Sequence, residues 1–132
     1  MIECIEATTL PPPRGHYSHA VSHGGLVYIS GQLPVAADGS VLAKSSFDDQ
    51  ARQAVGNLLA IAQAAGCGPA DLLKVTVYIV GIGNWPRFNA IYAEFMGEAR
   101  PARAVVPVPE LHDGCLVEIE AIAAEPAAQA KD

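Results

Sequence analysis

A two-residue alternation runs through residues 117–123, VEIEAIA, and it restricts this segment to a β-strand that is buried on one face. Val117, Ile119 and Ala121 fall on that face, whereas Glu118 and Glu120 share the other. A preceding strand carries Arg103 in an otherwise apolar run, and a polar turn at residues 112–114 joins the two. Because charges are costly to bury unless they are paired, Arg103 and the two glutamates mark either an exposed strand or a functional site.

Further segments have the composition of β-strands. Residues 2–6 are a candidate short strand, and residues 15–21 and 26–30 are two β-rich runs around a Gly-Gly turn, which predicts a hairpin. Residues 72–80, LLKVTVYIV, are rich in β-branched side chains, which favours a strand. A small extra strand is expected near residues 32–35.

Two segments predict amphipathic helices. Ser46 is a typical N-cap, apolar residues follow it at helical spacing, and Gly66 is a typical stop signal. The second helix is expected to begin with Asn84 as its N-cap and to end at Gly97.

The resulting order, β-β-β-α-β-α-β-β, predicts an α+β fold with both helices on one face of the sheet, because two helices are too few to cover both faces. One domain is expected over residues 1–124, followed by a frayed C-terminal tail over residues 125–132. The other face of the sheet stays uncovered and rich in Val, Ile and Ala, which predicts self-association.

The composition narrows the class of protein. A net charge of −6 with scattered basic residues disfavours a nucleic-acid partner. The three cysteines have no CxxC spacing, which indicates free thiols in a reducing compartment. Neither a secretion signal nor an apolar run of membrane-spanning length is present. A cytoplasmic protein without a membrane segment is therefore expected.

Arg103 and the glutamate pair are the first candidates for chemistry. A strand arginine can bind a carboxylate through two parallel hydrogen bonds, although a solvated arginine or an inter-subunit ion pair fits the same sequence. Glu118 and Glu120 can act as a general acid and base or can hold a water, although a solvated strand face is the commoner arrangement. The residues alone do not rank these alternatives.

Other candidates are weaker. His16, His19 and His23 lie close together, but they do not share a strand face, so a metal site is not indicated. Tyr17 can supply a hydroxyl to a cleft or can make a structural hydrogen bond. The GxSxG and phosphate-loop patterns are missing, which excludes the corresponding hydrolases and nucleotide folds.

Several short blocks together carry a family resemblance. In order they are GHYSHA from residue 15, VYISGQ from residue 27, Asn57-Leu58, FNAIY from residue 88, PAR from residue 101 and VEIEA from residue 117. This combination resembles the Rid family, the YjgF-type reactive intermediate deaminases, which are also labelled endoribonuclease L-PSP. The resemblance covers roughly residues 15–123, nearly the whole chain.

The resemblance implies a chorismate-mutase-like protomer assembled as a homotrimer, with clefts between subunits. It implies that Arg103 binds the carboxylate of the substrate and that Glu118 positions the attacking water. It further implies that Tyr17, the backbone at Ser30 and Gly31, and Asn89 line the cleft. Two positions depart from the family pattern: Val105 replaces a cysteine, and His16 replaces a proline.

The expected reaction is hydrolysis of a 2-imino acid to a 2-keto acid and ammonia. The imine is itself a good electrophile, so neither a metal nor an organic cofactor is expected. Two alternatives stay open: a non-catalytic trimer that binds small keto acids, and an endoribonuclease, which the acidic charge disfavours.

Overall fold

The computed structural model describes residues 1–127 of the 132-residue chain. Its helices and strands follow the predicted order. The strands are β1 (Glu3–Ile5), β2 (Ala20–His23), β3 (Leu26–Gln32), β4 (Leu72–Ile79), β5 (Ala102–Pro107) and β6 (Val117–Ala124), and the α-helices are α1 (Phe47–Ala64) and α2 (Trp85–Met96). Short 3₁₀ turns, η1 (Pro69–Asp71), η2 (Ile82–Asn84) and η3 (His112–Gly114), lie in three of the connections.

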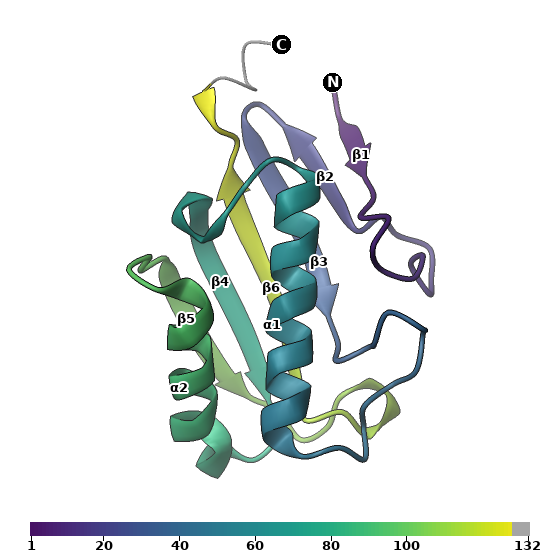
Figure 1. Cartoon of the computed structure of the whole chain (residues 1–132), viewed down its shortest axis with the longest axis vertical. Helices are drawn as coiled ribbons and strands as arrows, with labels where there is room; N and C mark the ends of the chain where they lie inside the picture. The colour runs from purple at the N-terminus through teal and green to yellow at the C-terminus, as the bar shows by residue number, and fades with distance from the viewer. Residues whose placement is uncertain (128–132) are drawn as a thin grey trace.

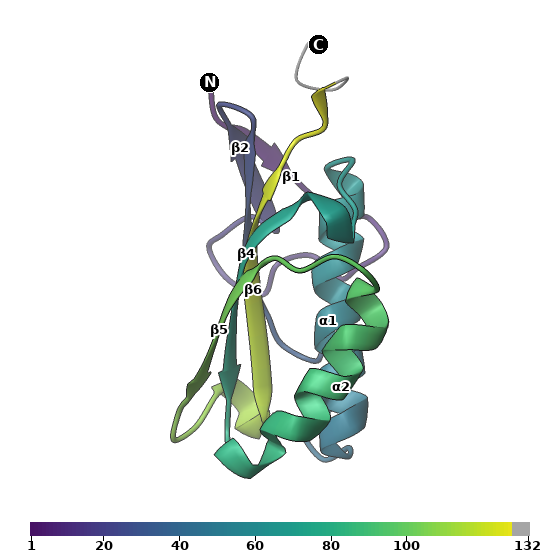
Figure 2. The same cartoon turned by 90° about the vertical axis from the view of Figure 1, so that its left-hand side faces the viewer.

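Within residues 1–127, the six strands form one sheet in the order β1-β2-β3-β6-β4-β5 (Figure 1). β4 and β5 run parallel, and the other neighbouring strands run antiparallel. α1 and α2 lie side by side on the same face, and the opposite face carries no helix (Figure 2). The α+β prediction, a mixed sheet with the helices on one face, is confirmed.

β5 and β6, which the sequence joins by a polar turn, are not neighbours in the sheet. β4 lies between them and pairs with both. The helical crossover through α2 makes β5 parallel to β4 and places it at the edge of the sheet. The segment after β5 then passes the end of β4, and β6 returns antiparallel between β3 and β4. Arg103 is therefore on an edge strand, whereas Glu118 is on a central one.

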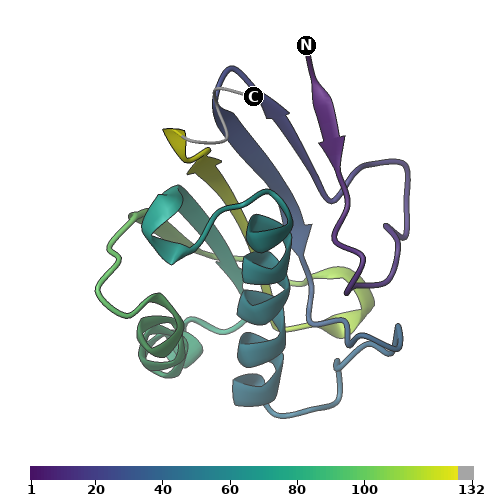
Figure 3. The same ribbon diagram turned by 45° about the horizontal axis from the view of Figure 1, so that its top comes forward.

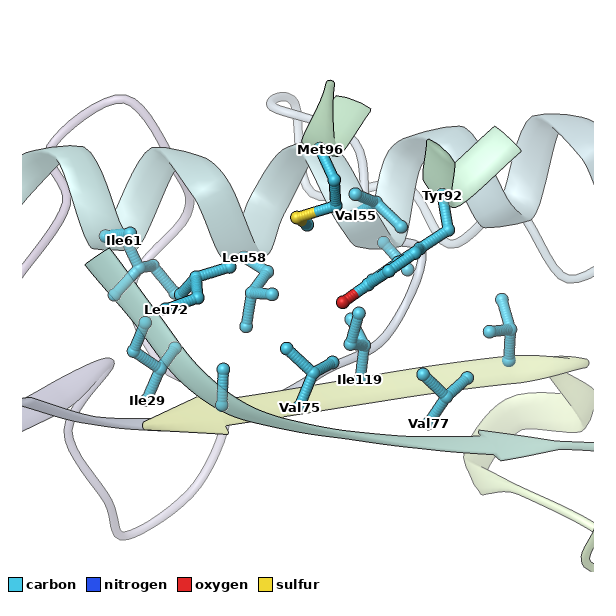
Figure 4. Close-up of a cluster of buried hydrophobic side chains, with 14 of the residues drawn as sticks. Ile29, Val55, Leu58, Ile61, Leu72, Val75, Val77, Tyr92, Met96 and Ile119 are labelled. Atoms are coloured by element: carbon cyan, nitrogen blue, oxygen red, sulfur yellow. The ribbon is translucent and has the colours of Figure 1, made fainter. Parts of the chain in front are cut away.

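The core lies between the sheet and the two helices (Figure 4). Ser46 caps α1 as predicted, because its hydroxyl accepts a hydrogen bond from the Asp49 N–H at 3.1 Å. The apolar stripe of α1 meets the inward side chains of β3, β4 and β6. The fully buried members include Val55, Leu58, Ile61, Val75, Val77 and Ile119.

Three local predictions need correction. The first strand of the hairpin begins at Ala20 instead of residue 15, because Tyr17 N–H turns back to the Gly15 carbonyl at 3.1 Å. Asn84 precedes α2, but its side chain donates to the Val80 carbonyl at 3.0 Å and does not cap the helix. The extra strand near residues 32–35 is an isolated bridge between Val35 and Val41.

The end of the chain is only partly described. β6 ends at Ala124, and the predicted frayed tail, residues 125–132, falls mostly outside the described residues. In the described part of the chain, neither helix has the length and hydropathy that a membrane crossing requires.

Candidate active site

A cavity of about 510 Å³ lies at the end of β3. Its walls come from the proline-rich loop before β2 (residues 10–19), the end of β3 with the residues that follow it, Asn57 of α1, and the segment from η3 into β6. Figure 3 shows that the loop before β2, the end of β3 and the segment that leads into β6 lie near one another although they are far apart in sequence. Four of the predicted site residues line it: Tyr17, Ser30, Gly31 and Glu118. This volume suits a small-molecule ligand.

Gly31 is the position that allows Glu118 into the cavity. The register between β3 and β6 shifts between Ile29 and Gln32, so Gly31 lies in a bulge. A Cβ atom built on Gly31 would collide with the Glu118 carboxylate oxygen Oε2 and would lie 3.1 Å from its Cδ. Glycine is needed here for space, and the missing side chain is the volume that the carboxylate occupies.

Burial raises the pKa of the Glu118 carboxyl, and the nearby Glu120 carboxylate adds to the rise, whereas His112 opposes it. The two glutamates share the face of β6 that points away from the helices, as the alternation predicts. Glu118 lines the cavity at the end of β3, and Glu120 does not. A half-buried carboxyl whose pKa is raised is suited to accept a proton from water near neutral pH.

Ser30 is held by hydrogen bonds to the segment that precedes β2. Its hydroxyl donates to the Ser18 carbonyl at 2.7 Å, and its N–H donates to the His19 carbonyl at 3.0 Å. Its own carbonyl accepts from the Gln32 side chain at 3.2 Å. Tyr17 is 50% exposed at the opening of the same cavity. Ser30 therefore shapes the cavity wall, and the ring of Tyr17 is accessible to solvent.

His19 is a structural residue. Its ring is buried, with Nδ1 accepting from the Ala7 N–H at 3.0 Å and Nε2 donating to the Pro11 carbonyl at 3.0 Å. These bonds tie the proline-rich loop to the start of β2. Within residues 1–127, no group of three or more His, Cys, Asp or Glu side chains is arranged to hold a metal ion.

Sequence reasoning assigned no role to two groups at the rim of this cavity. Arg14 and Asp113 form an ion pair at 3.0 Å across 99 residues, and both line the cavity, as does His112. Asp113 has a positive φ of 60°. The sequence predicted a turn at residues 112–114, but an ion pair between residues so far apart in sequence has no local pattern that could have revealed it.

Arg103, Asn89 and Val105 form a second group on the other side of the sheet. Arg103 pairs in register with Val75 and Val105 with Val77, and both point toward the helices. Arg103 Nη1 donates to Asn89 Oδ1 of α2 at 3.0 Å. Its guanidinium carbon lies 4.8 Å from the ring centre of Tyr92 and 5.9 Å from that of Trp85. Within residues 1–127, no carboxylate forms a salt bridge with this half-buried cation.

The predicted site residues thus fall into two groups that do not meet in one protomer. Glu118, Gly31, Ser30 and Tyr17 surround the cavity at the end of β3. The arginine group belongs to β5 and α2, beyond β4 and on the helix side of the sheet. One chain presents a carboxylate at one place and a cation at another.

Comparisons with known proteins agree with this fold. Residues 7–125 match the family described as endoribonuclease L-PSP. A RutC family protein of Pyrococcus horikoshii is 41% identical over 123 residues, which cover 93% of this chain and 98% of that protein. A Dermatophagoides farinae protein named 2-iminobutanoate/2-iminopropanoate deaminase is 36% identical over 118 residues, covering 89% of this chain and 92% of that protein. The crystal structure of E. coli TdcF with bound serine matches with a TM-score of 0.87 and 34% identity, over 94% of this chain and 99% of that one.

Proposed function

The chain belongs to the endoribonuclease L-PSP family, the Rid family of the sequence resemblance, and from this premise we propose that it hydrolyses 2-imino acids to 2-keto acids and ammonia. The family includes a relative named for that reaction. The observation that supports the proposal is a pair of complementary groups: a half-buried Arg103 that forms no salt bridge within residues 1–127, and a half-buried Glu118 whose carboxyl has a raised pKa. A cytoplasmic location is part of the proposal, supported by the three free cysteines.

We propose that the two groups meet between subunits of a homotrimer. The sheet face away from the helices carries the exposed ring of Tyr28 and the side chains of Val106 and Ile122. A second protomer on this face would bury apolar surface. It would also bring the β5 edge of one chain toward the Glu118 cavity of the next. Light scattering tests the assembly, with an expected mass of three 13.7 kDa chains.

The reaction follows from the chemistry of the two groups. Arg103 binds the carboxylate through its free N–H groups, which fixes the imine carbon beside a water. Glu118 takes a proton from this water as its oxygen bonds to the carbon of the protonated imine, giving a neutral carbinolamine. Glu118 returns the proton to the nitrogen, and ammonia leaves while the carbonyl double bond forms. The hydroxyl proton of the carbinolamine passes to Glu118, and the released ammonia takes it up as ammonium, which restores the carboxylate.

Turnover of 2-iminopropanoate, generated in the assay by an amino acid oxidase, tests the activity. We expect the protein to speed pyruvate release and to lose this effect on Arg103→Ala or Glu118→Gln. Glu120→Gln is the matched control, because Glu120 shares the strand and the face but does not line the cavity. A wild-type protein that accelerates none of several 2-imino acids would remove the deaminase proposal.

Mixed assemblies test the inter-subunit site. Chains with Arg103→Ala and chains with Glu118→Gln are each expected to be inactive alone. When they are co-expressed in equal amounts, about a quarter of the sites in random trimers receive an intact arginine from one subunit and an intact glutamate from its neighbour. Recovery of about this fraction of activity is expected, whereas no recovery would mean that one chain supplies both groups.

A binding protein without turnover is the second candidate, because the crystal structure of one relative, E. coli TdcF, contains bound serine. In that case Arg103 would hold a small keto acid or amino acid. Thermal stabilisation by 2-ketobutyrate without hydrolysis of any imine would favour it. RNA cleavage, which the family description names, is disfavoured by the net charge of −6.

A further inference from the structure

The surroundings of Arg103 contain more aromatic surface than carboxylate binding requires. Trp85, Asn89 and Tyr92 occupy positions i, i+4 and i+7 of α2, so they form one stripe on the helix. All three contact the arginine: the amide by a hydrogen bond, and the two rings by cation–π contacts at 5.9 and 4.8 Å. Three residues on one face of α2 thus contact the guanidinium of Arg103.

This arrangement restrains the guanidinium and leaves its donors free. A long arginine side chain has many rotamers, and ordering it on binding costs free energy. Here the rings lie against the planar guanidinium, while the one hydrogen bond to Asn89 uses only a single N–H group. The remaining N–H groups stay available for the planar carboxylate geometry that arginine recognises.

The two rings differ in what they can do. Tyr92 is 7% exposed, and its ring reaches from α2 into the core beside Val75 and Ile119 (Figure 4). Its hydroxyl has no hydrogen-bond partner in the described part of the chain, so the ring and not the hydroxyl serves the arginine. Trp85 is 37% exposed at the first turn of α2 and is therefore accessible to a ligand bound at Arg103.

We propose that Trp85 and Tyr92 are positioning residues that hold Arg103 in its carboxylate-binding orientation, with Trp85 forming one side of the ligand site. This inference rests on the proposed role of Arg103 in the proposed function. It goes further by assigning the affinity for the carboxylate to two aromatic rings, and it identifies Trp85 as a ligand contact.

The composition supplies a direct test. Trp85 is the sole tryptophan of the sequence, so its fluorescence reports from beside the guanidinium without background from other indoles. We expect saturable change in emission when 2-ketobutyrate is added to the wild-type protein. The change should be absent in Arg103→Ala at the same ligand concentrations. Emission that changes equally in both proteins would indicate collisional quenching and would contradict the contact.

Calorimetric titration of the variants with 2-ketobutyrate measures how much the aromatic ring at position 85 contributes to binding. Trp85→Ala should weaken binding by about three- to thirtyfold, the range of cation–π contacts that are partly desolvated. Trp85→Phe keeps a ring and should bind nearly as well as the wild type. Tyr92→Phe should be unchanged, and Tyr92→Leu should bind weakly. Arg87→Ala is the control, because Arg87 is an exposed arginine that lies over a different ring, that of Phe47, and forms its ion pair with Asp48.

Kinetics and binding together distinguish the two proposals. Loss of Trp85 should raise KM and leave kcat within a factor of a few, whereas loss of Glu118 should lower kcat. If Trp85→Ala and Trp85→Phe bind 2-ketobutyrate equally well, the positioning role is wrong even when the enzyme is active. If the wild type binds the keto acid but hydrolyses no imine, the deaminase proposal fails and the positioning role stands. If neither the wild type nor any variant binds 2-ketobutyrate, the positioning role is wrong.

Discussion

Replacing Gly31 by alanine should remove activity while leaving the fold nearly intact. The added methyl would collide with Glu118 Oε2 and would lie 3.1 and 3.4 Å from its Cδ and Cγ atoms. The carboxylate is the end of a rotatable side chain, so it would turn away from the cavity. Because this change displaces the proposed base without deleting it, we expect a loss of about 10²–10⁴ in kcat, the usual contribution of a general base.

The stability change can be estimated from two opposing effects. Adding a methyl group to a packed site costs about 1–3 kcal/mol. The φ angle of Gly31 lies outside the left-handed region, so alanine also restricts the unfolded chain and returns about 0.4–1 kcal/mol. The net loss of unfolding free energy should stay below about 2.6 kcal/mol, which urea unfolding can measure.

Gly56 is the matched control for this substitution. It lies within α1, and a Cβ atom there would meet nothing within 4 Å. Gly56→Ala should stabilise the protein by about 0.5–1 kcal/mol through helix propensity, with unchanged activity. A Gly31→Ala protein that retains at least half of the wild-type kcat would refute the reasoning, because Glu118 would then work from a position that the added methyl excludes.

Three further predictions concern buried polar groups. Gln50→Leu should lower the free energy of unfolding by about 2–4 kcal/mol in urea, because the buried amide donates to the Ala43 and Ser45 carbonyls and accepts from the Leu116 N–H. His19→Phe should cost about 1–3 kcal/mol and speed proteolysis in the proline-rich loop, because it removes the acceptor for the Ala7 N–H. Glu118→Gln should raise Tm at about pH 8 but not at about pH 3.5. Burial raises the pKa of this carboxyl above its ordinary 4.5, so the destabilisation that the substitution relieves appears only as pH rises through that range.

The sequence predicted the helices and strands better than it predicted which strands pair. Alternation at residues 117–123 and the Ser46 cap are local signals, and both are confirmed. The insertion of β4 between β5 and β6 depends on the helical crossover, which no local pattern encodes. Asn84 does not cap α2, because its side-chain amide donates a hydrogen bond to the Val80 carbonyl instead.

The candidate site shows the same division. Arg103 and Glu118 stood out because charges interrupt apolar strands, and this signal is present in the sequence. Their opposite orientations follow from the sheet order and from which face the helices cover. The contacts of Arg103 with Trp85 and Tyr92 also depend on how α2 packs. Aromatic residues at helical spacing occur in many amphipathic helices, so their spacing alone did not indicate a contact with an arginine.

The central place of β6 has a consequence for synthesis of the protein on the ribosome. Within residues 1–127, β6 is the last strand in chain order, yet it lies between β3 and β4 and pairs with both. A nascent chain that ends before Val117 holds two separate ribbons, β1-β2-β3 and β4-β5, each with an open edge where β6 belongs. The sheet can therefore be completed only after β6 has emerged from the ribosome. Chains that end before β6 expose two unpaired strand edges, which are prone to aggregation.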